Sequence, residues 1–409
     1  MPFASSAFGQ LRYITESVLG VIPGAGNGVN LRMTSPTMKA AVSTVVSKEI
    51  RSDRLSTGLT RSDLNVDGGF NFEFSGREYD PMLESLIGNP FAHYGTLGIG
   101  TVFAATTAAT TVTAAIAPTT TSAFTNLALS SWFKLVPPAG SSTAIKDYFA
   151  DKWFKTHSAT AATTTVITLD PSTPIAAPGL VTAIAGYAVS QSVMSNGSVQ
   201  KSFTTEYAMT DVAQFLTFPG MRANSMDLSM EVGSIITGSF DFLGMSHTIQ
   251  ATTLLPGSPV ASQVLEPMNS VTDVGAIYEA GTSLLTSTSF IKSVKLKISN
   301  GLRAQKAIGV FGTAGIGVGE LELSGSMEVY FQDATYYNKW LAATTTSFAF
   351  GMADSLGNGY LIELDKVQFK DGALNAGGRT EDVMLSLPFS AFFSPTTGRG
   401  IRITRAVSA

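Results

Sequence analysis

The side chains best suited to chemistry are few and scattered in this chain of 409 residues. Its histidines, His93, His157 and His247, lie far apart, and none forms the i, i+4 pair that binds a metal ion on a helix. Cysteine does not occur, so disulfides and thiolate metal sites are excluded. The carboxylates are dispersed, and no motif points to the pair that a glycosidase needs. We therefore predict no catalytic residue, no metal site, no cofactor and no enzymatic activity.

The glycine-rich stretches do not predict a phosphate-binding loop. GAGNG at 24–28 and GTAGIGVG at 312–319 match neither GxGxxG nor GxxxxGK[ST], and no βαβ pattern surrounds them. We interpret their glycines as turn residues, because glycine adopts positive φ without steric cost.

The run SKEIRSDRLSTGLTRSDLNVD at 47–67 is the first informative charged pattern. Only 14% of the chain is charged, yet here positive and negative side chains alternate and cancel. A solvated hairpin would explain the run. An arm that pairs with another copy of the chain would also explain it, because alternating charges set register and specificity. The candidate contact residues are Lys48, Arg51, Asp53, Arg54, Arg61 and Asp63.

The second informative pattern is acidic. In GELELS at 319–324, strand alternation places two glutamates on one face and two leucines on the other. An ordinary water-facing strand accounts for this pattern. The alternative is a channel wall whose negative charge repels DNA phosphates. The candidate lumen-facing acids are Glu73, Asp241, Glu320, Glu322 and Glu328.

Most of the elements that position these residues are β-strands. Alternation of apolar and polar residues dominates the chain, glycine and Asn/Asp turns separate the runs, and helical patterns are few and short. We expect a strand over 319–331 and a helix capped by Asp80. Strands do not alternate with helices, which argues against a parallel sheet.

One strand-turn-helix unit occurs twice, as GGFNFEFSGREYDPMLESLIG at 68–88 and GSMEVYFQDATYYNKWLAAT at 325–344. A strand, a hairpin-like excursion and a second strand precede each unit, and further strands follow. A separation this long indicates a duplicated domain, because solenoid repeats recur every ~20–50 residues. We predict a first repeated domain at 1–96 and 201–250, a small inserted β domain at 97–200, a linker at 251–285 and a second repeated domain at 286–409.

The composition narrows the functional classes. Low charge indicates either a surface buried in an oligomer or a Ser/Thr-rich monomer. A net charge of −4 without a basic tract argues against tight binding of nucleic acid. Residues 85–133 carry no charge, but their threonine-rich centre at 101–121 favours β structure over a membrane helix. The first residues lack the pattern of a signal peptide.

Several of these segments resemble the tail tube (major tail) proteins of long, non-contractile-tailed bacteriophages. They are KEIRSDR…DLNVDGGFNFEFSGREYDPMLESLIG, SFTTEYAMTDVAQFLTFPGMRANSMDLSMEVGSIITGSFDFLGMS (202–246) and the C-terminal GSMEVYFQDATYYNKWLA…GYLIELDKVQFKDGALNAGGRTEDVMLSLPFSAFF. The resemblance implies a mainly β fold with two tandem tube-type β-sandwich domains. Each domain would have a short flanking helix and a long hairpin.

The resemblance also implies a function. It implies a structural virion protein that self-assembles into stacked rings around a hollow bore, through which the genome enters the host. Residues 47–67 match the hairpin that stacks the rings. The second excursion, 299–318, departs from that pattern because only Arg303 and Lys306 are charged. Two unequal tube domains per chain predict a ring of three chains with pseudo-sixfold symmetry.

The implied partners are further copies of the chain, the tape-measure protein, the tail terminator and the distal tail protein. Viral DNA would pass without specific binding, no membrane is involved, and the virion tail would assemble in the host cytoplasm. The inserted domain would decorate the exterior. Two alternatives stay open: another ring- or fibre-forming virion component, such as a baseplate or spike protein, and a β-sandwich carbohydrate hydrolase.

Overall fold

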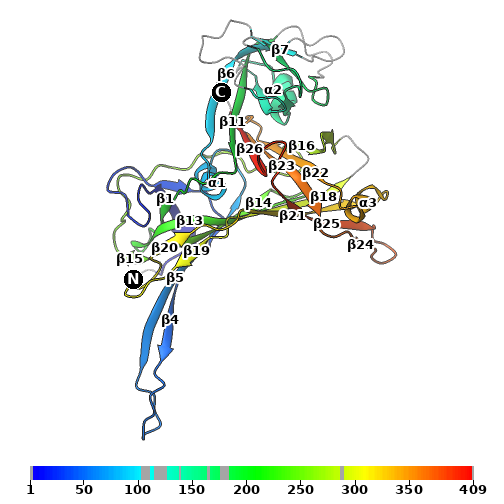
Figure 1. Cartoon of the computed structure of the whole chain (residues 1–409). Coiled ribbons are helices and arrows are strands. Elements are labelled where there is room, and N and C mark those ends of the chain that lie inside the picture. The colour runs from blue at the N-terminus through cyan, green and yellow to red at the C-terminus, as the bar shows by residue number, and fades with distance from the viewer. Residues whose placement is uncertain are drawn as a thin grey trace.

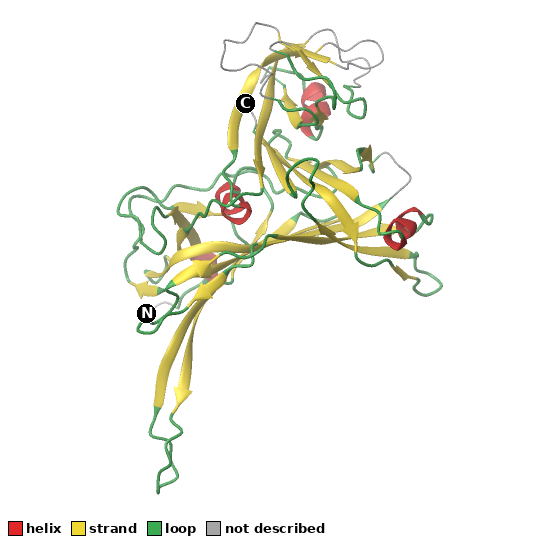
Figure 2. Ribbon diagram, in the orientation of Figure 1, coloured by secondary structure: helices red, strands yellow, loops and turns green. Residues whose placement is uncertain are grey.

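The computed structural model describes residues 3–102, 111–114, 127–137, 140–163, 166–175, 184–285 and 290–407. Over these ranges the chain is mainly β, as expected, with short helices at its margins (Figures 1 and 2). Much of the threonine-rich segment at 101–121 lies outside the described residues. None of the described helices is long and apolar enough to cross a membrane.

A central antiparallel sheet runs through both halves of the molecule in the order β4–β5–β14–β13–β18–β21–β25–β23. Short strands, β3 and β24, extend its two ends. The strands are β3 (Ser35–Pro36), β4 (Lys39–Val46), β5 (Leu59–Glu73), β13 (Gln214–Glu231), β14 (Thr237–Gly244), β18 (Ile291–Ser299), β21 (Glu322–Tyr330), β23 (Gly359–Phe369), β24 (Ala373–Asn375) and β25 (Met384–Ala391).

The same strand order occurs twice within this sheet. In the first half it is β4–β5–β14–β13, and in the second half it is β18–β21–β25–β23. The pairing of β13 with β18 joins the halves, with Leu228 opposite Leu296. The duplication predicted from the sequence is therefore visible in the hydrogen-bonded order of the strands.

An outer layer of strands covers one face of the central sheet. The long strands β13 and β23 belong to both layers, because each pairs with outer strands along its first part and with central strands along its second. The outer strands of the first half are β1 (Gly9–Thr15), β2 (Val29–Leu31), β12 (Phe203–Met209) and β15 (Thr248–Gln250), and those of the second half are β16 (Val274–Glu279), β17 (Thr282–Ser283), β22 (Thr346–Ala353) and β26 (Ile401–Ala406). Although β16 lies in the expected linker of 251–285, it pairs with β22.

Alternate residues of the central strands fill the core between the two layers. Phe72 packs against Phe240 and Tyr79 with ring centroids 5.2 and 4.4 Å apart. These side chains and the equivalent residues of the second half form one continuous cluster of buried residues. Because side chains alternate along a strand, the intervening polar residues face away from the core on the open side of the sheet.

Helix α1 (Asp80–Ile87) links the two halves. Tyr79, rather than Asp80 as predicted, occupies the N-cap position, and it makes no capping hydrogen bond through its side chain. The Asp80 carboxylate instead accepts hydrogen bonds from Tyr360 on β23 and Arg405 on β26. Arg405 also lies over the ring of Phe91, 4.9 Å from its centroid. In the second half, α3 (Thr335–Leu341) occupies the corresponding place after β21.

The segment between α1 and β12 folds around its own small core. Leu135, Phe149, Phe154 and Ile167 belong to a cluster separate from the main one. Its stem strand β11 pairs with β26, so the segment rests on the outer layer of the second half. Its elements are β6 (Ala92–Val102), β7 (Thr111–Ala114), β8 (Trp132–Val136), α2 (Thr143–Ala150), β9 (Phe154–Lys155), β10 (Val166–Thr168) and β11 (Ile184–Ser195). A 3₁₀ turn, η1 (Ser6–Phe8), begins the described chain.

A buried lysine lies where this segment meets the second half. Lys134 is fully buried, donates a hydrogen bond to the Ala150 carbonyl and lies 5.4 Å from the ring centroid of Trp153. Burial lowers the pKa of Lys134 to about 7, because an apolar site disfavours the charged ammonium. Above that pH, the folded chain therefore binds fewer protons here than the unfolded chain.

We expect this lysine to make stability depend on pH. Between its folded pKa of about 7 and its ordinary value of 10.5, its contribution to the unfolding free energy should rise with pH. The slope should reach about 1.4 kcal/mol per pH unit. The Lys134→Met variant has a neutral side chain at every pH. Its unfolding free energy, measured with urea, should therefore lack the rise with pH that Lys134 causes. Equal pH dependence in both proteins would contradict the assignment.

Candidate assembly surfaces

The longest projection of the molecule is the β4–β5 hairpin (Figures 1 and 2). Its tip residues, 47–58, are all exposed, and the turn includes Arg54 at a φ of 61°. Arg51 and Asp53 form an ion pair of 2.9 Å within the tip, and this hydrogen bond lowers the pKa of the Asp53 carboxyl. The side chains of Lys48, Arg54 and Arg61 are exposed. The charged run thus lies on a projecting arm, and its contact with another copy stays a prediction.

The same arm carries an apolar surface that the charge analysis missed. Ile50 is 99% exposed and Leu55 70% exposed at the tip. Exposed aliphatic side chains continue along both strands. A hydrophobic surface on a projecting arm is typical of an interaction site, because isolated soluble proteins rarely expose such patches. The signal was present in the sequence as the run of valines before the charges. The further exposed residues are Val42, Val45, Val46 and Leu59.

The second excursion, 299–318, does not project as the first does. Its short hairpin of β19 (Arg303–Gln305) and β20 (Gly315–Gly317) folds back against the first half. The Lys306 ammonium donates to the Asp63 carboxylate at 3.0 Å and to the Leu64 carbonyl oxygen at 2.8 Å. Arg222 on β13 donates to the Ile316 carbonyl oxygen at 3.2 Å. The two excursions therefore differ in shape as well as in charge.

This contact changes the interpretation of one predicted residue. Asp63 was expected to contribute to a contact between rings, but its carboxylate lies against Lys306 of the same chain. The hydrogen bond from Lys306 also lowers the pKa of the Asp63 carboxyl. Asp63 thus braces the base of the hairpin. The loop beyond Lys306 exposes further apolar side chains, Ile308, Val310 and Phe311.

The predicted lumen-facing acids can be placed through strand register. Opposed residues of an antiparallel pair lie on the same face of the sheet. Glu73 is opposite Thr237, and Glu328 is opposite Ser293. By this register, four of the five acids lie on the polar face of the central sheet. They are Glu73, Asp241, Glu322 and Glu328. Glu320 is exposed but precedes β21, because the strand begins at Glu322 rather than at 319 as predicted.

The polar face is not uniformly acidic, which differs from the expected negative wall. Lys292 lies 3.5 Å from Glu328, and Lys297 lies 3.4 Å from Asp227 across the β13–β18 junction. Lys295 is exposed on the same face. The spacing in IKSVKLKIS predicts this face, since lysines at 295 and 297 alternate with buried residues. These lysines were not among the predicted residues of this face.

The edge of the central sheet at β24 corresponds to the strand that forms the internal junction in the first half, but it is more exposed. Leu374 on β24 is opposite Leu385, and Leu228 on β13 is opposite Gly238. These positions correspond when the two halves are aligned by strand order. Leu228 is 1% exposed because β18 lies beside it, whereas Leu374 is 45% exposed. Among the described strands, the second half therefore presents as an unpaired edge the position that is covered in the first half.

The described side chains contain no group of three His, Cys, Asp or Glu residues that could hold a metal ion. His157 illustrates the ordinary role of an isolated histidine. Its Nδ1 accepts hydrogen bonds from the backbone amides of Ala159 and Thr160, each at 3.0 Å. This residue stabilises a turn.

Together, the continuous sheet and the projecting arm define a β-rich protein with two similar halves. The model of the phage tail tube protein family matches residues 9–391. The chain belongs to that family, and it is therefore a virion component of the bacteriophage tail. A search of curated proteins found no match to the chain. The family match spans the inserted segment as well as both repeated halves.

We expect the Lys306 contact to control the mobility of the hairpin base. Replacing Lys306 with alanine removes the hydrogen bonds to Asp63 and Leu64, which should loosen the base of the hairpin. Hydrogen exchange in residues 59–66 should accelerate by ~2–5-fold as a result. Lys292→Ala, which removes a comparable ion pair on the polar face, is the matched control. Unchanged exchange in the Lys306 variant would exclude a bracing role.

Proposed function

We propose that the chain self-assembles into rings that stack into the hollow tail tube, the conduit through which the phage genome enters the host. The observation that carries the proposal is the β13–β18 junction, which joins two similar units edge to edge within one chain. A free edge at the other end of the same sheet allows the same contact to form between chains. Repeating a head-to-tail contact closes a ring when its rotation divides a full turn.

The internal junction identifies the edges that would meet. Leu228 on β13 lies opposite Leu296, which in turn lies opposite Gly325 on β21. When the two repeats are aligned, Gly325 corresponds to Gly68 on β5. Gly68 lies beside the segment at 37–38 in the sheet. We infer that Leu374 of one chain packs beside this segment of the next chain. Three chains would then supply six similar units, in agreement with pseudo-sixfold symmetry.

The order of the layers indicates which face of the central sheet would line the bore. The polar face carries serine, threonine, acidic and lysine side chains, whereas the opposite face packs against the core. The segment between α1 and β12 lies beyond that core, where Trp132 and Trp153 pack on Ala276 and Leu361 of the outer layer. We therefore propose that the polar face lines the bore and that this segment decorates the exterior. We retain the predicted domain boundaries as part of the proposal, except that β16 and β17 of the predicted linker belong with the second half.

The hairpin is the proposed contact between successive rings. Its exposed aliphatic residues provide the area that must be removed from water, and its alternating charges provide register. Arg51, Arg54, Lys48 and Arg61 remain the proposed ionic contacts. Tape-measure, terminator and distal tail proteins are the proposed heterologous partners, with assembly in the host cytoplasm.

Electron microscopy of the purified protein at high concentration tests the proposal. We expect hollow tubes or stacked rings, and mass measurement of single rings should give three chains. Leu374→Lys should prevent ring closure, because a charge would enter a junction whose internal counterpart is almost fully buried. Leu356→Lys, at another exposed leucine, should leave rings intact.

Two outcomes would contradict this assembly. A protein that stays monomeric at all concentrations and salt conditions would exclude self-assembly. Closed rings of the Leu374→Lys variant would exclude the proposed edge. Rings that never stack would favour a baseplate component.

Variants of the arm separate its ionic and apolar contributions. The Arg51→Ala/Arg54→Ala variant should still form rings but should stack more weakly, and high salt should reduce the difference from the native chain. Ile50→Ser/Leu55→Ser should weaken stacking at every salt concentration, because lost apolar burial is not screened. Sedimentation of assembled tubes measures both effects. Native stacking by both variants would reject the arm as the ring contact.

A further inference from the structure

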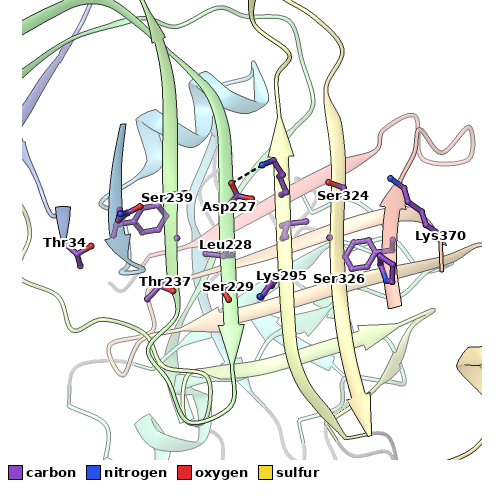
Figure 3. Close-up of a pocket in the computed structure, with 18 residues that line it drawn as sticks. Thr34, Asp227, Leu228, Ser229, Thr237, Ser239, Lys295, Ser324, Ser326 and Lys370 are labelled. Carbon is purple, nitrogen blue, oxygen red and sulfur yellow. Dashed lines mark hydrogen bonds and ion pairs between the residues drawn. The ribbon is translucent and has the colours of Figure 1, made fainter. Parts of the chain in front are cut away.

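A groove of about 680 Å³ crosses the polar face at the junction of the two halves (Figure 3). Its floor is the backbone of the central strands, because Leu228, Leu296 and Phe389 direct their side chains into the core. The side chains on the groove side are mostly hydroxyl or lysine groups. They include Ser229, Ser239, Ser324, Ser326, Lys295 and Lys370.

Charge is divided across this groove. On the first-half side, residues 69–73, 225–231 and 237–241 contain the acids Glu73, Asp227, Glu231 and Asp241 and no lysine or arginine. On the second-half side, β18 contributes lysines at 292, 295 and 297, and Lys370 follows β23. Strand β21 adds two acids to this side, Glu322 and Glu328, and Glu328 is paired with Lys292, so the lysines outnumber the acids. The second-half side therefore attracts anions, although the chain as a whole has a net charge of −4.

The lysines of this sector are available to a ligand. The residues opposite Lys295 on its two neighbouring strands are Ser229 and Ser326, so no carboxylate faces it across the sheet. The Lys297 ammonium lies 3.4 Å from the Asp227 carboxylate, but its side chain remains half-exposed. Lys295 and Lys297 project from the same face about 7 Å apart, two residues along one strand. Lys370 is exposed at the far side of the groove.

We propose that this lysine sector contacts the phosphodiester backbone of double-stranded DNA. Lysines and hydroxyl groups are the side chains that contact phosphate oxygens without reading sequence. A stably bound acidic protein would also need apolar anchors, which are the usual source of affinity in protein interfaces. The groove lacks them, since its apolar side chains other than Pro388 are turned into the core. The chemistry of the groove therefore favours DNA over an acidic polypeptide.

This contact is weak and independent of sequence. Three lysines can displace counterions from about three phosphates, which predicts a slope of roughly −2.7 for log K against log salt concentration. The acids of the first half repel DNA from the adjacent surface. The inference rests on the proposed function, in which this face lines the bore, and it identifies where passing DNA meets the wall.

Fluorescence anisotropy with a labelled DNA duplex at low salt tests the contact on the full-length chain. We expect measurable binding by the native chain and at least fivefold weaker binding by Lys295→Ala/Lys370→Ala. The slope against salt should fall to about −0.9, because one groove lysine remains. The control Lys146→Ala/Lys152→Ala removes the same charge from the segment between α1 and β12, and it should bind like the native chain. A labelled polyglutamate peptide tests the alternative polyanion.

Three results would overturn the inference: no DNA binding at low salt, equal loss in the control, or preferential binding of polyglutamate. Circular dichroism of each variant verifies that the fold is retained. Ring formation, observed separately by electron microscopy, tests the proposed function. Variants that form normal rings but do not differ in DNA binding would reject the lysine contact alone. Binding that depends on the groove lysines without rings would reject the assembly alone.

Discussion

The antiparallel pairing of β13 with β18 is the constraint on which the rest of the molecule depends. It places opposed residues such as Met226 and Ile298 in register and merges two sheets into one. A slip of one residue would turn every side chain of the second half to the wrong face. The register therefore fixes, at once, the continuous core and the continuous polar face.

Buried polar contacts reinforce this junction from the outer layer. Asp80 connects the helix of the first half to Tyr360 and Arg405 of the second half. Burial raises the pKa of the Asp80 carboxyl, while the Arg405 guanidinium and the Tyr360 hydroxyl act in the opposite direction. Such a buried cluster is costly to leave half-satisfied, so it favours one relative placement of the two halves over others. Sheet pairing and side-chain contacts thus specify the same arrangement.

The sequence predicted the fold better than it predicted the surfaces. Period-two alternation located β21 to within three residues at each end, because one face of the strand is buried. The duplication was visible for the same reason, since Phe70, Phe72 and Phe74 recur as an apolar pattern rather than as identities. Helix α1 was also anticipated, with Gly88 ending it in the left-handed conformation at a φ of 73°. Only its first turn was misjudged, because Asp80 binds distant residues that a local pattern cannot reveal.

The surfaces depended on contacts between residues far apart in the chain. Nothing near Asp63 in the sequence indicates that Lys306 will lie beside it. Equally, the mixture of acids and lysines on the polar face arises only when β18 is placed next to β13. The apolar residues of the arm could have been noticed, but alternating charges are the stronger local signal.

The retracted second excursion has a consequence for symmetry. In a ring of three chains, the six similar units would alternate between a long arm and a folded-back loop braced by Lys306. Two successive rings would then have three equivalent rotational settings instead of six. In the proposed assembly, fusing two unequal units into one chain would halve the number of equivalent rotations by which one ring can stack on the next.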